Sequence, residues 1–462
     1  MLKHVISLLV IAAAPAAAQP LTAQQTAAID QAVAKALADT AVPSASITIV
    51  RDGKIVLTRA YGKANEGLPA QANHPYQIAS ISKQFTAMAL LLLEDEGKLN
   101  LDDKVSKWVP GISGGDKIAL RQLLNHTSGL QDYWPQDFSF PAMARPTSPQ
   151  AIVDIWAKKP LDFAPGDQAQ YSNTGYVIAG MIAEKASGEP LMSYLKRKIF
   201  VPLKMTSVVN QDDAIGAAFP SGYGRYALGP VRPVTPAARG WLYAAGELSM
   251  SAEDLAKWNI ARINRSLVPA DDWAAQETTA KLNDGTAIPN GLGVFVSNSS
   301  GRRAVGHGGE SVGFLATNTV YPAERTAITV MTNSWSGGAY GRISREIAKI
   351  VLPQPPEAAA ASATTQRARI VYDQLRTGAL DRSLLTDNAN YYFTEQAVAD
   401  YRSSLGPLGA PTSFEPNGKP SPRGGFMIQG YTIKYPARTL NLSTFYEPAS
   451  GRIEQFLVSP GE

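Results

Sequence analysis

The chain has 462 residues, a formal net charge of +4 and no cysteine, and 45% of its residues are hydrophobic. This length is enough for two or three domains, each with its own core. The small net charge and the lack of a clustered basic motif exclude nucleic-acid binding as the main function. Without cysteines, disulfides, thiolate metal sites and cysteine nucleophiles are excluded as well.

The first eighteen residues have the pattern of a secretory signal. Lys3 and His4 give a positive start, residues 5–14 form a short apolar run, and small residues at 16–18 supply a cleavage site. The apolar run is too short to span a bilayer, and no later stretch is long enough. We therefore predict export, to a periplasm, with an uncleaved membrane anchor as the alternative interpretation of this segment.

The elements predicted next are a helix over residues 22–40 and two β-rich runs over 46–50 and 55–58. An Asp-Gly pair between the two runs is a common hairpin turn. A mainly helical region follows, from Ser80 to about Met205. The chain therefore begins with a helix and a hairpin and continues into a helical insert.

Strands return from Leu292 onward. The predicted strands cover 292–296, 303–305, 314–320 and 326–331, and a helix over 342–351 closes the unit. Strands at both ends of a helical insert indicate one antiparallel sheet that is built from both ends and covered by helices.

A linker and a small domain are predicted at the C-terminal end. Residues 353–365 are rich in proline and small residues, which is typical of a linker. The domain at 366–462 combines two helices with three strands; they cover 368–377, 394–404, 425–435, 439–447 and 452–458. This pattern is similar to the cone-shaped α+β fold of the NTF2-like kind. A pocket, a self-association surface and a cover for a sheet edge remain open as its role.

Ser80 and Lys83 carry most of the functional prediction. They place a hydroxyl and an amine three residues apart at the head of an apolar helix over 84–93. Residues i and i+3 share a helix face, so Lys83 can reach the Ser80 oxygen. A serine is a weak nucleophile until a neighbouring base takes its proton. The pair therefore predicts a covalent serine hydrolase.

Two other motif matches are interpreted as coincidences. Ser193 and Lys196 repeat the spacing, but they lie on an amphipathic stretch with a basic, solvated face. Residues 96–100 contain a Glu-x-x-Leu-Asn pattern, but they follow Ser80 by 16 residues at a helix end.

Tyr171 and Asn173 form a second candidate motif, 91 residues beyond Ser80. The ammonium of Lys83 is expected to lower the pKa of the Tyr171 phenol. Tyr171 could then act as general base toward Ser80 and later as acid toward the leaving group. The Asn173 amide can anchor Lys83 or the substrate carbonyl. A packed aromatic with a satisfied hydroxyl is the alternative for Tyr171.

A third candidate motif consists of His307, Gly308 and Gly309, just before the predicted strand at 314–320. Two glycines let a substrate backbone approach closely. The histidine can donate a hydrogen bond to a substrate carboxylate or help to orient Tyr171.

Three histidines follow the predicted signal, at positions 74, 126 and 307. A three-histidine zinc site is arithmetically open, but no close spacing supports it. His126 is interpreted as structural, tying a turn through its ring nitrogens. No metal and no cofactor is predicted.

Together, these motifs resemble the serine β-lactamase and penicillin-binding protein superfamily, and best its class C-like branch of esterases and D-amino-acid peptidases. The resemblance runs from about residue 22 to 351 and includes the phrases at 123–129, 171–176, 245–251 and 306–309. It implies an α+β, β-lactamase/transpeptidase-like fold over 19–352, with an antiparallel sheet flanked by helices and a helical subdomain. A small α+β domain follows it.

The resemblance also implies roles for the motif residues. Ser80 would be the acylated nucleophile, Lys83 and Tyr171 the base system, and Asn173 a polar positioner. His307, Gly308 and Gly309 would hold the third-motif strand, and the backbone N–H groups of Ser80 and Glu310 would form the oxyanion hole.

The third motif departs from the pattern of the β-lactamases, which usually carry Lys-Thr-Gly or Lys-Ser-Gly there. This chain contains no Lys-x-Gly, and the missing cation weakens the case for binding the carboxylate of a penicillin. Glu247 stands where a second glycine is expected after Gly246 and could narrow the cleft.

We predict an exported serine hydrolase that forms an acyl-enzyme on Ser80 and takes small esters, D-amino-acid amides or peptides. One alternative is a β-lactamase or D-Ala-D-Ala carboxypeptidase. Another is a non-catalytic binder of cell-wall fragments. No nucleic-acid partner and no stable membrane span are expected, and self-association is left open.

Overall fold

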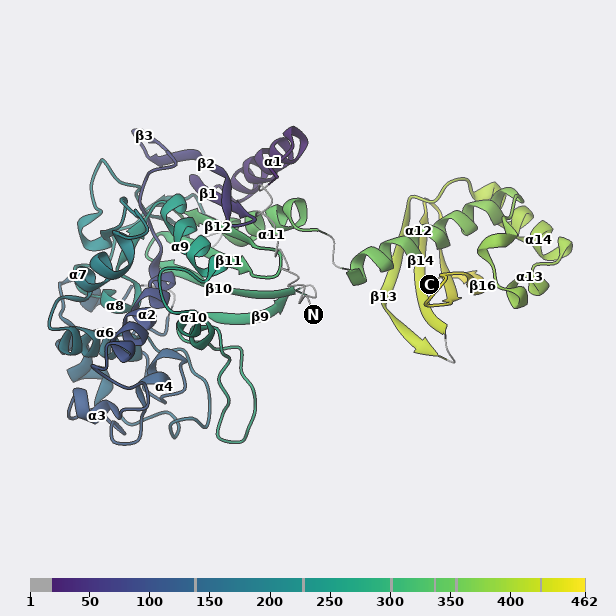
Figure 1. Ribbon diagram of the computed structural model, residues 1–462. Coiled ribbons are helices and arrows are strands. Elements are labelled where there is room, and N and C mark those ends of the chain that lie inside the picture. The colour runs from purple at the N-terminus through teal and green to yellow at the C-terminus, as the bar shows by residue number, and fades with distance from the viewer. Residues whose placement is uncertain are drawn as a thin grey trace, which may run out of the picture. The chain divides into compact units, whose positions relative to one another are not determined.

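The structure is a computed structural model that describes residues 19–136, 139–226, 229–299, 302–335, 338–353, 356–423 and 426–461 (Figure 1). The predicted signal at 1–18 lies outside the described residues. The chain divides into two compact units, Met1–Pro353 and Gln354–Glu462, which are described separately.

A seven-stranded antiparallel sheet, in the order β3-β2-β1-β12-β11-β10-β9, is the centre of the first unit. Its strands are β1 Ser44–Arg51, β2 Lys54–Asn65, β3 Leu68–Pro69, β9 Phe295–Ser299, β10 Arg302–Ser311, β11 Phe314–Tyr321 and β12 Thr326–Thr332. Strand β1 pairs with β12, with Ile47 opposite Val330. The two ends of this unit therefore meet in the middle of one sheet, as the sequence predicts.

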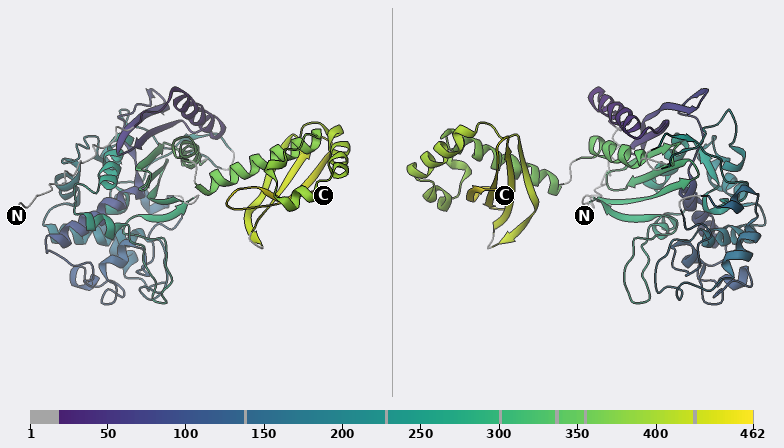
Figure 2. Two further views of the ribbon diagram at one scale, coloured as in Figure 1. Left: turned by 45° about the vertical axis from the view of Figure 1, so that its right-hand side comes forward. Right: turned by 180° about the vertical axis from the view of Figure 1, so that it is seen from behind.

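Helices cover both faces of this sheet. Helices α1 (Ala23–Thr40) and α11 (Ala339–Val351) lie together on the face that carries Ile47 and Ile49 (Figures 1 and 2). Helix α9 (Ala252–Asn264) packs on the opposite face, against Val50. Successive strand residues point to opposite faces, so β1 contributes to both cores.

A helical subdomain completes the first unit around two long helices, α2 (Lys83–Asp95) and α6 (Asn173–Ser187). Its shorter helices are α3 Val105–Trp108, α4 Leu120–Leu124, α5 Pro149–Ile152, α7 Leu191–Leu195, α8 Tyr243–Gly246 and α10 Ala270–Gln276. Two small sheets accompany them, β4 Tyr76–Gln77 with β8 Leu248–Met250 and β5 Val209–Asn210, and β6 Tyr223–Gly224 with β7 Arg232–Pro233. In the described part of the chain, no helix has the length and apolar character needed to cross a membrane.

The described residues of the second unit form a four-stranded antiparallel sheet and three α-helices. The strands, in spatial order, are β13 Ser413–Arg423, β14 Phe426–Tyr435, β15 Arg438–Tyr446 and β16 Ile453–Pro460. The helices are α12 Pro356–Thr377, α13 Asp387–Tyr392 and α14 Glu395–Leu405. The long helix α12 lies across the sheet, and its Tyr372 packs in the same core as Tyr431 (Figure 2).

The structure differs from the sequence predictions at three places. Most of the predicted linker at 353–365 is helical, because alanine is a strong helix former and a proline is tolerated at the first helical position. Strand β13 was not predicted, because Pro416 and Pro420 argue against a strand; it is an edge strand, where proline is tolerated. The strand predicted at 303–305 is longer than expected, so His307 lies within β10, and β11 follows it as predicted.

Candidate active site

Ser80 lies in a 3₁₀ turn, Ala79–Ser82, directly before helix α2. The predicted helix therefore begins at Lys83, and the nucleophile candidate precedes it. Ala79 has φ +46°, a left-handed conformation that a non-glycine residue adopts at a cost. This turn is held by its surroundings, since the Cα of Ala79 lies within van der Waals reach of a Cβ placed on Gly246.

The Lys83 amine is completely buried and has three oxygen neighbours. Its Nζ lies 2.9 Å from Ser80 Oγ, 2.8 Å from Asn173 Oδ1 and 2.7 Å from the Ala245 carbonyl oxygen. Burial lowers the pKa of Lys83 to about 7, while the negative charge of Asp132 acts in the opposite direction. A neutral amine has two N–H groups for Asn173 and Ala245, which leaves its lone pair directed at Ser80 Oγ. Lys83 is thus placed to take the serine proton.

Tyr171 also contacts the serine, but its pKa moves against the prediction. Burial is the largest cause that raises the pKa of the phenol, the charges of Asp132 and Glu310 raise it further, and a hydrogen bond with Ser80 lowers it. The Lys83 Nζ lies 4.9 Å from the Tyr171 ring centre. The expected lowering fails because Lys83 is itself driven toward its neutral form and gives little permanent charge. The phenol therefore keeps its proton and can relay one.

Asn173 begins helix α6 and connects Lys83 to a carboxylate that the sequence did not single out. Its Nδ2 donates to Asp132 Oδ2 at 3.1 Å, and its backbone N–H donates to Asp132 Oδ1 at 3.1 Å. Burial raises the pKa of Asp132, and hydrogen bonds from Trp134 and Asn173 and the charge of Lys83 oppose the rise. Asp132 follows the turn at 125–130 as a single acidic residue, so only its proximity to that motif could have marked it.

His307 lies on β10 and differs from the predicted carboxylate donor. Its Nδ1 is in hydrogen-bond contact with the Gly308 carbonyl, which can only accept, so Nδ1 carries the ring proton. Burial, with a smaller contribution from Lys83, lowers its pKa to about 3, so the ring is neutral. Its buried Nε2 has no hydrogen-bond partner among the described residues. This nitrogen can accept a hydrogen bond but cannot donate one to a carboxylate.

Gly309, the second glycine after His307, lets β10 pass close to the nucleophile turn. A Cβ on Gly309 would lie 2.1 Å from the Ile78 carbonyl oxygen, so no other residue fits there. The register of β9 with β10 runs from Arg302 opposite Ser299 to Gly306 opposite Phe295. The side chain of Glu310 accepts a hydrogen bond from Trp335 Nε1. The oxyanion role of the Ser80 and Glu310 N–H groups stays a prediction.

His126 supports the site from behind. Its ring stacks on Tyr171 at 4.3 Å between ring centres, and its Nδ1 accepts a hydrogen bond from the Ser172 N–H at 3.2 Å. One ring nitrogen therefore holds the turn before Asn173. Across the described ranges, no group of three or more histidine, aspartate or glutamate side chains is placed to hold a metal ion.

These residues open onto a cleft of about 580 Å³. Its lining includes Ser80, Asp132, Trp134, Gln170, Tyr171, Asn173, Phe295, His307, Gly308, Gly309, Glu310, Trp335 and Tyr340. The described lining holds two carboxylates and no lysine or arginine. Ser193 and Lys196 are exposed and lie outside this lining, and Glu247 is buried and does not narrow the cleft.

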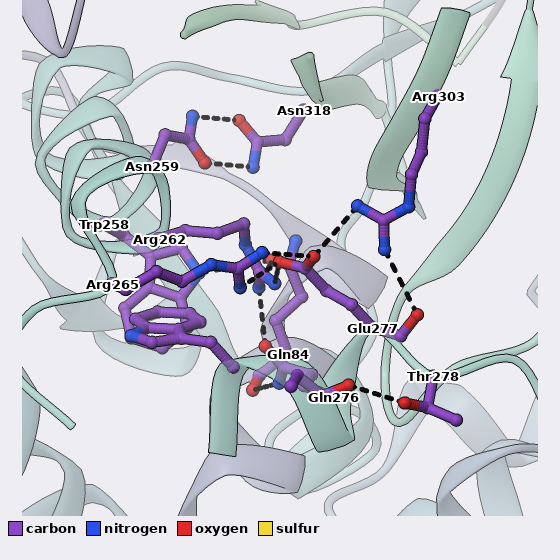
Figure 3. Close-up of polar contacts among 12 residues, drawn as sticks. Gln84, Trp258, Asn259, Arg262, Arg265, Gln276, Glu277, Thr278, Arg303 and Asn318 are labelled. Atoms are coloured by element: carbon purple, nitrogen blue, oxygen red, sulfur yellow. Dashed lines mark hydrogen bonds and ion pairs between the residues drawn. The ribbon is translucent and has the colours of Figure 1, made fainter. Parts of the chain in front are cut away.

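An ionic network around the buried Glu277 contacts Gln84 in the first turn of α2 (Figure 3). Glu277 accepts hydrogen bonds from Arg262 at 3.1 Å, Arg265 at 2.8 Å and Arg303 at 3.1 Å. Arg262 also donates to Gln84 Oε1 at 3.0 Å. Because Gln84 follows Lys83 and Arg303 lies on β10, the network connects the helix and the strand that carry the candidate motifs.

A Ser-x-x-Lys turn at the cleft of this fold defines a serine hydrolase of the β-lactamase/transpeptidase-like class. The family model described as Beta-lactamase matches residues 29–352, so the chain belongs to the β-lactamase family. Penicillin-binding protein 4* of Bacillus subtilis (strain 168) is 29% identical over 329 residues, which cover 66% of this chain and 72% of that protein.

Two solved structures have similar folds. A D-stereospecific amidohydrolase from Streptomyces sp. is 29% identical with a TM-score of 0.60, over 71% of this chain and 98% of that one. The octameric penicillin-binding protein homologue from Pyrococcus abyssi is 22% identical with a TM-score of 0.62, over 95% of this chain and 96% of that one. The second likeness concerns the fold alone and extends into the C-terminal unit.

Proposed function

We propose that the protein hydrolyses amides of D-amino acids that have a free amino group, through an acyl-enzyme on Ser80. The observation that carries the proposal is the contact between the buried Lys83 amine and Ser80 Oγ at 2.9 Å. The likeness to a D-stereospecific amidohydrolase supports the amide and its chirality.

The charges of the cleft support a substrate with an ammonium group. Asp132 and Glu310 supply carboxylates, and no cationic side chain is present in the described lining. The neutral His307 offers a lone pair on Nε2 rather than a proton. These groups attract an ammonium and repel a carboxylate. Aromatic side chains at Trp134 and Phe295 are suited to an apolar substrate side chain.

The proposed reaction begins with transfer of the Ser80 hydroxyl proton to Lys83 Nζ. The serine oxygen bonds to the amide carbon, and the carbonyl electron pair moves to the oxygen, which faces the N–H groups of Ser80 and Glu310. Tyr171 gives its proton to the leaving nitrogen and receives the proton held by Lys83. The C–N bond breaks and ammonia or an amine departs. Water then attacks the ester, and the same groups return the proton to Ser80.

The test compares D-phenylalanine amide with its N-acetyl derivative and with the L enantiomer. We expect release of ammonia from the D amide that Ser80→Ala abolishes, and a kcat/KM about ten-fold lower or worse after acetylation, because the ammonium is lost. Glu310→Gln should reduce this preference for the free amine. Equal turnover of the free and acetylated amides, or turnover that survives in Ser80→Ala, would contradict the proposal.

A β-lactamase or D-Ala-D-Ala carboxypeptidase is the second candidate, favoured by the likeness to Penicillin-binding protein 4*. Such substrates end in a carboxylate, which the described lining does not match with a cation. Efficient hydrolysis of a penicillin would promote this candidate.

We also propose export to a periplasm, which rests on the sequence of residues 1–18 alone. N-terminal sequencing of the exported protein tests it, with a mature start at Gln19 as the expected result.

A further inference from the structure

Asp132 is a cleft residue to which neither the motifs nor the steps of the proposed reaction assign a part in the activation of Ser80. It is half-buried and lies at the cleft, directly beside Asn173. Its Oδ1 accepts hydrogen bonds from the backbone N–H groups of Trp134 and Asn173, both at 3.1 Å. Its Oδ2 accepts from Asn173 Nδ2 at 3.1 Å. The carboxylate is thus fixed by three donors, and two of them belong to one residue.

This contact determines which way the Asn173 amide faces. A carboxylate can only accept hydrogen bonds, so the amide must present its NH₂ group to Asp132. Its oxygen then faces the other side, where Lys83 Nζ lies at 2.8 Å. With one N–H bound to Asn173 Oδ1 and another to the Ala245 carbonyl, a neutral Lys83 has its lone pair left for Ser80.

We propose that Asp132 is a positioning residue, which orients the Asn173 amide and thereby aims the Lys83 lone pair at Ser80. The proposal rests on the proposed function, since it assigns Asp132 a role in the activation of Ser80. Asp132 acts on the serine through Asn173 and Lys83 and touches neither reacting atom.

Among the groups that face Lys83, Asp132 is the carboxylate whose charge acts on the amine. Tyr171 and Tyr176 present their rings, at 4.9 and 5.3 Å from Nζ, and keep their protons because burial raises both pKa values. His126 and His307 are neutral, since burial and Lys83 lower their pKa values. Removing the charge of Asp132 therefore lowers the pKa of Lys83.

The test measures the rate at which a fluorophosphonate labels Ser80, as a function of pH. This rate needs a deprotonated Lys83 but no knowledge of the natural substrate. In the wild type we expect the labelling rate to rise with pH around the pKa of Lys83, which is about 7. In Asp132→Asn the new NH₂ group faces Asn173 and turns its amide, so that the Lys83 lone pair is diverted from Ser80. We expect the plateau rate to fall about ten-fold or more, and the rise to move to lower pH.

Asp162→Asn is the matched control. Asp162 is an exposed carboxylate near the same cleft that accepts a hydrogen bond from Gln170 Nε2 at 2.7 Å and does not contact Asn173. The Asp162→Asn variant should have the wild-type labelling rate and the wild-type dependence of this rate on pH. Asp132→Glu keeps the charge, so the rise should stay near its wild-type pH even where the rate falls. Thermal unfolding checks that each variant is folded.

Two results would overturn the proposal. One is a folded Asp132→Asn protein that is labelled at the wild-type rate with the same pH dependence. The other is a loss of rate with no movement of the rise, which a merely structural role would give. Failure of the proposed function has a different signature: the free and acetylated amides would be turned over equally, or Ser80→Ala would be labelled and active like the wild type.

Discussion

Lys83 and Arg262 are both buried, with 0% and 1% of their surface exposed, and both lie against the first turn of α2. Arg262 meets the carboxylate of Glu277, and although burial lowers its pKa to about 10, it stays charged. Lys83 meets neutral oxygens, and burial lowers its pKa to about 7. Two equally buried basic side chains therefore behave differently. Arg262 stays a structural cation because it is a guanidinium paired with a carboxylate, whereas Lys83 becomes a titratable base because it is an amine among neutral oxygens.

Replacing Lys83 by arginine should have the largest effect on the rate at which Ser80 is acylated. Lys83→Arg places a permanently charged guanidinium beside Ser80, which cannot take a proton. We expect acylation of Ser80 to fall by about 10²–10⁴-fold, the range that general base catalysis contributes. The rate of fluorophosphonate labelling measures it. Arg262→Lys is the reciprocal change, and it should alter stability more than labelling. Labelling of Lys83→Arg at the wild-type rate would contradict the comparison.

Removing the partner of the structural cation should affect stability instead. Glu277→Gln leaves Arg262 buried without a charge partner, which typically costs about 3–5 kcal/mol of unfolding free energy. Denaturant unfolding measures the loss, and Asp154→Asn, which breaks the exposed pair with Lys158, is the control with no measurable change. The pH at which Ser80 labelling rises should stay as it is, because Glu277 does not face Lys83. If the pH at which Ser80 labelling rises changed in Glu277→Gln, Glu277 would also affect Lys83, and this would contradict the distinction between the two cations.

A buried carboxylate without a cation extends the comparison to acids. Burial, with the nearby Asp212 and Glu184, raises the pKa of Glu247 to about 7. The folded protein thus holds this proton between pH 4.5 and 7, where the unfolded chain loses it, so the wild type loses stability as pH rises through that window. Glu247→Gln should therefore be more stable by about 2 kcal/mol at pH 8, with no difference near pH 4. Melting curves at both values test it, and an equal gain at both would contradict the pKa argument.

The local part of the fold could be predicted from the sequence. A short stretch of sequence is enough to predict some of the elements, because their apolar pattern is local. These elements are the strands β1, β11 and β12 and the long helix α2. The pairing of β1 with β12 followed from strands at both ends of an insert. Strand β13 was missed because its prolines argue against a strand wherever the edge position is unknown.

The candidate site was predictable as a set of motifs but not as an electrostatic environment. Ser80 and Lys83 are three residues apart, so the 3₁₀ turn that leads into α2 brings them together. Asp132 and Asn173 are 41 residues apart, and their contact depends on packing that no short window contains. The predicted direction of the Tyr171 pKa shift was wrong for the same reason, because burial and the charges of Asp132 and Glu310 raise this pKa.

The central claim is that Ser80 is acylated with Lys83 as its base. Intact-mass spectrometry after brief exposure to a p-nitrophenyl ester, followed by peptide mapping, tests it most directly. We expect a transient acyl adduct on the peptide that contains Ser80, present in the wild type and absent from Ser80→Ala and Lys83→Arg. An adduct on another residue, or nitrophenol release that persists in Ser80→Ala, would contradict it.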